Sequence, residues 1–228
     1  VSRNSVREAI HALAERGLAV GLIDADVHGF SIPPLLGLVE PDGLPPQPTR
    51  IDDLMLPPVA YGVKTISIGM FLPRDQPAAA VAWRGPMLHR TVSQFLTDVF
   101  FGDLDVLLLD MPPGTGDVAI SVGQLLPHAD VLVVTTPQTA ASDVAVRSGL
   151  VAGQTGQHVV GVVENMAAMT LPDGSTLDLF GAGRSRTPPS PQATKSRMSA
   201  NARRASSNTT RSWVIPSRRL RSAMAASM

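Results

Sequence analysis

The most informative stretch of the sequence is DVLLLDMPPGTGD, residues 105–117, in which an apolar run ends in Asp110 and a Pro-Pro-Gly-Thr-Gly loop follows. A continuous apolar run is typical of a buried parallel strand, and ligands of open α/β sheets bind at the carboxyl ends of such strands. Asp110 could hold Mg²⁺ on a bound phosphate there, because Mg²⁺ prefers oxygen ligands and keeps part of its hydration shell. Gly114 could bring its backbone N–H close to a terminal phosphate, since glycine has no Cβ. The same residues also fit a buried strand that ends in a solvent-facing Asp before a tight turn.

A phosphate-binding loop of the form GxxxxGK[ST] is missing from the sequence. Such a loop supplies backbone N–H groups around the phosphates and a lysine that reaches their oxygens. The chain has two lysines, Lys64 and Lys195, and neither follows a glycine-rich loop. We therefore expect negligible nucleotide turnover from the chain itself.

Composition limits the kinds of site that the chain can form. Its 228 residues are 44% apolar, enough for the core of one good-sized domain. There is no cysteine, which excludes disulfides and any cysteine-ligated zinc or iron–sulfur site within the polypeptide. No apolar run reaches the roughly 18 residues of a membrane span and no signal peptide opens the chain, so we expect a cytoplasmic protein without membrane contact.

Apolar strands alternate with helical patterns along the first 182 residues. Helical spacing is seen at 5–16, 86–101, 117–126 and 139–153, and Asp173-Gly174 between alternating residues predicts a hairpin over 170–180. Between these helices, strands end at Asp24, Asp110, Thr136 and Asn165. This order predicts an α/β domain with a doubly wound, mostly parallel sheet, one edge of which is lined with polar groups.

Residues 183–228 differ sharply from this domain. They contain ten of the 19 basic residues and no acid, with almost no apolar periodicity. Such a composition buries too little surface to offset its ordering entropy, so we predict a disordered basic tail. It could be a basic arm that binds nucleic acid or an anionic membrane, or a segment read out of frame. We favour the second interpretation because the change at FGAGR is abrupt.

Four motifs occur in order along the chain: DADVHG (24–29), WRGPM (83–87), DMPPGTGD (110–117) and VENM (163–166). With these motifs residues 6–182 closely resemble the Mrp/ApbC family, P-loop ATPases of the MinD-like deviant Walker class that act as iron–sulfur cluster carriers. The resemblance implies a P-loop NTPase fold for residues 1–182, with ATP and Mg²⁺ as cofactors. It also implies an iron–sulfur cluster, iron–sulfur apoproteins as partners and a homodimer in the intact form.

The resemblance further implies roles for five residues. Asp24 and Asp26 belong to the first switch region, with Asp26 as the candidate for positioning the attacking water. Asp110 serves the Mg²⁺, Gly114 senses the γ-phosphate and Asn165 hydrogen-bonds the adenine base. On residue type alone, the two acids could simply be polar strand ends and Asn165 could be a capping residue.

The chain also departs from the family pattern. The family's GKGGVGKS loop is absent, Ala167, Ala168 and Met169 replace its cysteine pair, and its last strands and helices are missing. We therefore interpret the chain as a truncated or frame-disrupted member whose ATPase activity is lost. Two alternatives are a MinD- or ParA-like spatial organiser, against which WRGPM argues, and a non-catalytic interaction protein of the same fold. Nucleic acid is not an expected partner.

Overall fold

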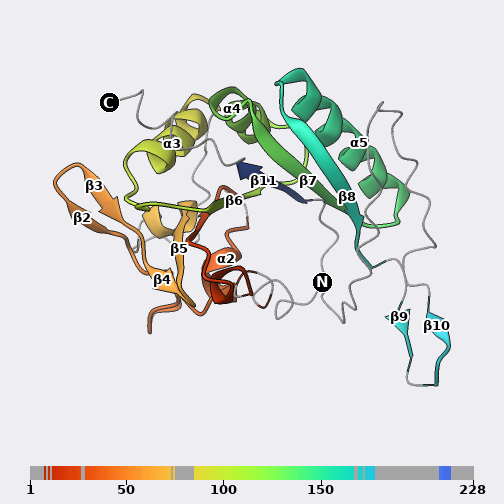
Figure 1. Cartoon of the computed structure of the whole chain (residues 1–228), viewed down its shortest axis with the longest axis horizontal. Helices are drawn as coiled ribbons and strands as arrows, with labels where there is room; N and C mark the ends of the chain where they lie inside the picture. Colours follow the sequence, from red (N-terminus) through yellow and green to blue (C-terminus); the bar gives the residue numbers. More distant parts are fainter. Residues whose placement is uncertain are drawn as a thin grey trace.

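Seven strands form one central sheet in the described part of the chain (Figure 1). The computed structural model describes residues 8, 10, 12–26, 29–72, 74, 85–166, 169–171, 173–177 and 211–216. In order across the sheet, the strands are β4 (Val59–Ala60), β5 (Val63–Ser67), β1 (Val20–Asp24), β6 (Val106–Met111), β11 (Arg211–Pro216), β7 (Ala129–Thr135) and β8 (His158–Glu164).

The sheet is mostly parallel and its strands are joined through helices. β5, β1 and β6 pair in parallel, as do β7 and β8, whereas β4 and β11 run antiparallel to their neighbours. The helices are α2 (Ile32–Leu35), α3 (Gly85–Thr97), α4 (Asp117–Leu125) and α5 (Thr139–Gln154). The predicted doubly wound α/β sheet is therefore confirmed. Across the described ranges, no helix combines the length and the apolar character needed to cross a membrane.

Side chains of the central strands enter two separate apolar cores, one on each face of the sheet. Ile23 and Leu109 belong to the larger core, and Leu22 and Leu108 to the smaller one. Successive strand residues point to opposite faces, so both faces of β1 and β6 are buried. This double burial explains why the two strands are continuous apolar runs in the sequence.

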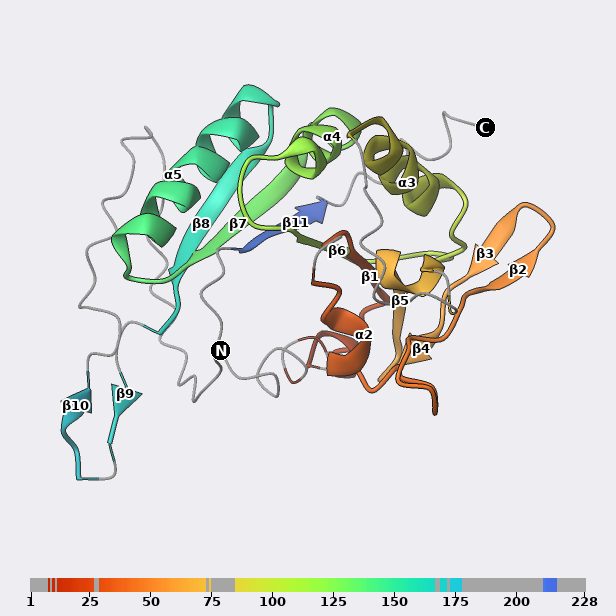
Figure 2. The same ribbon diagram turned by 180° about the vertical axis from the view of Figure 1, so that it is seen from behind.

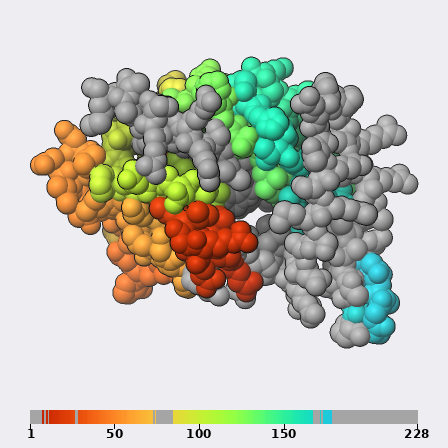
Figure 3. Space-filling model, in the orientation of Figure 1, coloured from red at the N-terminus to blue at the C-terminus, as the bar shows by residue number. Residues whose placement is uncertain are grey.

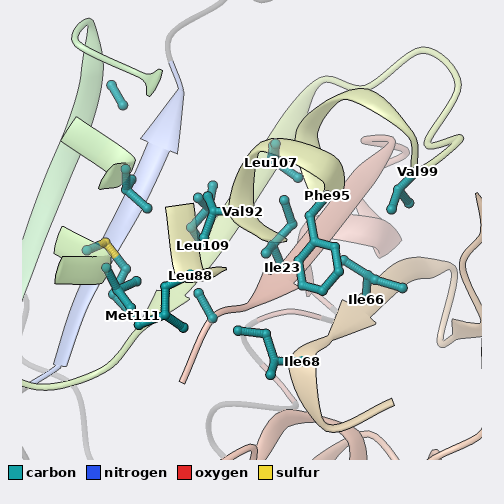
Figure 4. Packing of buried hydrophobic residues seen from close by; sticks show 14 of the residues in the cluster. Ile23, Ile66, Ile68, Leu88, Val92, Phe95, Val99, Leu107, Leu109 and Met111 are labelled. Atoms are coloured by element: carbon teal, nitrogen blue, oxygen red, sulfur yellow. The ribbon is translucent and has the colours of Figure 1, made fainter. Parts of the chain in front are cut away.

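The helices cover the two faces unequally. Figures 1 and 2 show α3, α4 and α5 along one face and α2 on the opposite face. In Figure 4, Leu88, Val92 and Phe95 of α3 lie over the strand residues Ile23 and Leu109. The apolar stripe that predicted this helix thus forms the main contact with the sheet.

The helix predicted over 86–101 is shorter in the structure, where α3 ends at Thr97. The residues that follow pair with the strand β3 (Leu54–Leu56) instead. Met55 N–H donates to the Asp98 carbonyl and Phe100 N–H donates to the Met55 carbonyl, each over 2.8 Å. These backbone bonds stop the helix even though the apolar spacing continues.

The proline-rich segment from residue 31 to 62 contains α2, β4 and a hairpin. The hairpin consists of β2 (Thr49–Ile51) and β3, and it projects at the β4 end of the sheet, in orange in Figure 3. Strands of two or three residues are too short for a periodic pattern. Periodicity therefore does not predict these strands.

Two further predictions fall partly on described residues. In the hairpin predicted over 170–180, β9 (Met169–Thr170) pairs antiparallel with β10 (Thr176–Leu177), and Gly174 takes a positive φ of 82° in the turn. In the helix predicted over 5–16, residues 8, 10 and 12–15 are helical, residue 16 lies in a turn, and the others lie outside the described residues.

The tail that we predicted to be disordered contributes one strand. β11 lies between β6 and β7, with Ser212 in register with Met111 on one side and Val133 on the other. Its sequence, RSWVIP, is rich in β-branched and aromatic residues, which favour extended structure. It also supplies backbone partners to the facing edges of two buried strands. Disorder does not describe these six residues and stays a prediction for the rest of the tail.

Helices α4 and α5 approach closely at Gly123. A Cβ at Gly123 would lie 2.5 Å from the Cβ of Thr155, where no atom fits. The Thr155 hydroxyl donates to the carbonyls of Val151 and Ala152 over 3.0 Å, which holds that side chain in place. Glycine inside a helix costs about 1 kcal/mol relative to alanine, and this contact explains why it is present.

We expect Leu109→Ala to lower the free energy of unfolding by about 3 kcal/mol, because it leaves a cavity in the fully buried centre of the larger core. Leu150→Ala removes the same side chain from a site on α5 that is 58% exposed and is the matched control. Urea unfolding followed by circular dichroism measures both. Equal losses for the two variants would contradict this description of the core.

Candidate functional site

The two strands that end in aspartate are neighbours in the sheet. Asp24 at the end of β1 is in register with Asp110 near the end of β6, and both side chains are fully buried. Ala25 N–H donates to the Asp110 carbonyl over 2.9 Å, so the chain leaving β1 stays attached to β6. The structure therefore brings two of the predicted site residues together at the carboxyl edge of the sheet.

The Asp24 carboxylate is the hydrogen-bonding centre of this edge. One oxygen accepts from Asp26 N–H over 3.2 Å, and the other accepts from the Ser67 hydroxyl over 3.1 Å and from Ile32 N–H over 3.4 Å. Burial raises the pKa of Asp24 from about 3.8 to about 7, although all three hydrogen bonds act in the opposite direction. Loss of water thus outweighs the donors that the fold supplies.

Asp26 lies two residues beyond β1 and is 4% exposed. The chain turns close to its carboxylate at Gly29, where a Cβ would lie 3.1 Å from Asp26 Oδ2. The negative charge of Asp26 is also one of the causes that raise the pKa of Asp24. Asp24, Asp26 and Asp110 therefore form one acidic group at the sheet edge.

Gly114 lies in the loop between β6 and α4 and takes a positive φ of 98°. This left-handed conformation favours glycine, and a Cβ there would point into open space. The hydroxyl of Ser148 in α5 donates a hydrogen bond to the Gly114 carbonyl over 3.3 Å, which attaches the loop to α5. The loop continues into the first turn of α4, whose free N–H groups are suited to an anion.

Asn165 lies at the same sheet edge but further along it. Its backbone N–H donates to the Thr135 carbonyl over 2.7 Å, and its side-chain oxygen accepts from Met166 N–H over 3.0 Å. In the sheet β8 is three strands from β6, a distance of about 14 Å at the usual strand spacing. Asn165 is thus separate from the acidic group, and its side-chain oxygen makes a local bond to the next residue.

Two hydroxyl groups add to the polar edge. Ser67 ends β5, and its hydroxyl donates to Asp24. The sequence does not show which strand lies beside β5, so Ser67 was not among the predicted site residues. Thr136 follows β7, as predicted. Its hydroxyl is buried and has no hydrogen-bond partner among the described residues.

The described part of the motif WRGPM meets the end of DMPPGTGD between α3 and α4. Gly85, Pro86 and His89 face Asp117, Ile120, Ser121 and Gln124 across an open cavity of about 370 Å³. A Cβ at Gly85 would lie 2.6 Å from Asp117 Oδ2, so α3 begins against α4. The most distinctive residues of the sequence therefore serve helix packing as well as the site.

The donor set limits which metals the site can hold. Among the described residues no group of three His, Cys, Asp or Glu side chains could hold a metal ion. A cation bound by Asp110 would need further oxygens from a ligand and from water, which is the usual situation of Mg²⁺ on a nucleotide. Magnesium therefore fits the residues present. A cysteine-bound cluster does not, because the sequence contains no cysteine.

Because its pKa is raised on folding, Asp24 should make the protein less stable as the pH rises. The folded chain binds the Asp24 proton more tightly than the unfolded chain does. The stability that this proton adds is therefore complete below pH 4 and is lost between about pH 4 and pH 7. The total loss should be on the order of 4 kcal/mol. Urea unfolding across this range should show a flatter pH profile for Asp24→Asn than for the parent. Asp143→Asn, at an exposed position of α5, should keep the parental slope.

The Thr136 hydroxyl has no hydrogen-bond partner among the described residues, so its removal should not lower the free energy of unfolding. Thr136→Val keeps the shape of the side chain and removes a buried group that makes no hydrogen bond, so stability should stay the same or rise by up to about 1 kcal/mol. Thr135→Val is the control, since the Thr135 hydroxyl donates to the Thr136 carbonyl over 3.3 Å and its loss should destabilise. Thermal unfolding distinguishes the two. A clear loss in Thr136→Val would show that its hydroxyl is bonded in solution.

Comparison with known proteins places the chain in a family. A family model described as NUBPL iron-transfer P-loop NTPase (ParA) matches residues 2–196. Proteins named iron–sulfur cluster carrier protein are 57% identical over 175 residues in Mycobacterium tuberculosis and 44% identical over 163 residues in Bacillus subtilis. These matches cover 77% and 72% of the chain. The chain spans 44% of the length of each of these relatives.

A solved structure agrees with these matches. A nucleotide-binding protein from Archaeoglobus fulgidus, described in complex with ADP and with cobalt, superimposes with a TM-score of 0.63 at 32% identity. The match covers 80% of this chain and 69% of the archaeal one. The resemblance to Mrp/ApbC proteins is thereby confirmed, and the chain belongs to the NUBPL iron-transfer family of P-loop NTPases.

Proposed function

We propose that the chain binds ATP with Mg²⁺ at the carboxyl edge of its sheet and that this binding serves the delivery of iron–sulfur clusters to apoproteins. The main support is the register of Asp24 with Asp110, which gathers the acidic group beside the Gly114 loop. The names of the relatives and the ADP complex of the archaeal protein support the same proposal.

Asp110 is the proposed ligand of Mg²⁺. Its carboxylate is buried at a strand end, and Mg²⁺ is commonly held by one or two carboxylates together with phosphate oxygens and water. When bound, the ion would neutralise negative charge on the phosphate oxygens. Asp24 lies beside Asp110 and keeps the following loop attached through its three hydrogen bonds.

The remaining residues would surround the nucleotide. The Gly114 N–H would donate to the γ-phosphate, and Asp26 would orient the attacking water at the terminal phosphate. Asn165 would hydrogen-bond the adenine base, for which its separation of about 14 Å from the β6 end leaves room. A side-chain amide can donate to and accept from a base edge, which suits Asn165 to this role.

The cluster enters this proposal as cargo. These 228 residues contain no cysteine, so cysteine ligands for the iron would come from outside them. Pairing of two copies in a homodimer is part of the proposal on family grounds. The chain described here would contribute nucleotide binding to such an assembly.

Binding without turnover is the expected behaviour of this chain. The sequence has no glycine-rich loop with a lysine, and the loss of such groups slows phosphoryl transfer by roughly 10³-fold or more. This observation also favours a second candidate function, that of a non-catalytic protein whose binding to a partner protein changes when ATP binds. The two candidate functions differ in whether nucleotide alters the transfer of a cluster to an apoprotein.

We expect titration calorimetry to detect ATP binding that depends on Mg²⁺. Asp110→Asn should weaken the binding of ATP with Mg²⁺ by about tenfold or more, because it removes a charged ligand of the ion. Asp53→Asn is the matched control, since it removes an exposed carboxylate from the turn between β2 and β3. Steady-state ATP hydrolysis should stay below about one turnover per minute.

Two results would contradict the proposal. Equal affinity for ATP with and without Mg²⁺ would remove the role of Asp110. ATP hydrolysis faster than this limit, if it is lost in Asp110→Asn, would show that the chain hydrolyses ATP without a glycine-rich loop and its lysine.

A further inference from the structure

Ser67 contacts the acidic group from a strand to which no role has been assigned. It ends β5 in register with Asp24 and is fully buried. Its hydroxyl donates to Asp24 Oδ2 over 3.1 Å and accepts from Gly69 N–H over 3.2 Å. Both bonding directions of the hydroxyl are therefore used, one of them by a carboxylate.

The Asp24 carboxylate passes this restraint on to the loop that carries Asp26. Its two oxygens bind Asp26 N–H near the start of the loop and Ile32 N–H at the first residue of α2. The backbone between these two residues is thus held at both ends by one side chain. Any rotation of that carboxylate would release both ends together.

The segment after Ser67 supports the same loop from the side. Residues Ile68–Phe71 form a 3₁₀ turn whose N-cap is Ser67. A Cβ at Gly69 would lie 2.6 Å from the ring of Phe30, so the turn lies directly against the loop. Ser67 therefore orders both the carboxylate that holds the loop and the turn that packs on it.

We propose that Ser67 is a positioning residue, whose hydroxyl fixes the Asp24 carboxylate and through it the loop that places Asp26 at the sheet edge. The proposal rests on the proposed function for the role of Asp26, while the restraint on the loop does not depend on nucleotide. A hydroxyl is suited to this place because it can donate and accept at the same time. Alanine would remove a donor from a buried carboxylate, and water cannot replace it there.

Amide hydrogen exchange on the ligand-free chain tests the restraint. In Ser67→Ala we expect the amides of Asp26 and Ile32 to exchange about tenfold faster than in the parent. The amide of Leu109, in the centre of β6, should keep its protection. Ser67→Cys fills more of the space with a weak donor and should show the same selective loss, which keeps the test valid if the alanine variant does not fold.

Thr65→Val is the matched control. Thr65 lies two residues earlier on β5, is also fully buried, and donates its hydroxyl to the Val63 carbonyl rather than to Asp24. This variant should keep parental exchange at Asp26 and Ile32. The proposal is overturned if both Ser67 variants leave these two amides within twofold of the parent, if neither folds, or if Thr65→Val exposes them equally.

Repeating the exchange with saturating ATP and Mg²⁺ separates this proposal from the function. In the parent, ATP binding should slow exchange of the Asp26 amide. In Ser67→Ala, the factor by which ATP slows exchange of this amide should be at least tenfold smaller. If the parent does not respond to ATP, the proposed function fails, and the ligand-free comparison still decides the role of Ser67. If the parent responds and Ser67→Ala responds equally, Ser67 does not position the loop for the ligand.

Discussion

Two buried carboxylates lie side by side at the carboxyl ends of neighbouring parallel strands, and the remainder of the site is arranged around that charge. The sheet places Asp24 and Asp110 side by side because β1 and β6 pair in register and are buried on both faces. A buried carboxylate is costly unless hydrogen bonds or a cation compensate. The three donors to Asp24 compensate only in part, since its pKa stays raised. Such an edge is suited to receive a cation.

The supports of this edge come from both sides of β6. On one side, β5 and β1 supply the group that holds the Asp26 loop. On the other side, α5 holds the Gly114 loop through Ser148, and β7 and β8 carry Thr136 and Asn165. These two halves of the sheet pair with each other through β11. The separation between the Gly114 loop and Asn165 therefore depends on β11, the strand that lies between β6 and β7.

The sequence predicted the parts of this arrangement that follow from periodicity and strand ends. Apolar runs that stop in Asp24 and Asp110 were sufficient to place both carboxylates at one edge, because parallel strands end on the same side. The partnership of Ser67 with Asp24 was not predictable, since it depends on the lateral order of β5 and β1. Likewise, the end of α3 depends on backbone pairing with a three-residue strand, and β11 depends on edges that are far away in the sequence.

The contact at Gly123 links the packing of two helices to the Gly114 loop. The position tolerates no side chain, because Thr155 of the neighbouring helix end occupies the space and is fixed by its own hydrogen bonds. A larger residue would push apart α4, which starts beside the Gly114 loop, and α5, which holds that loop through Ser148. A substitution at Gly123, about two helical turns from the start of α4, would therefore disturb the Gly114 loop without touching it.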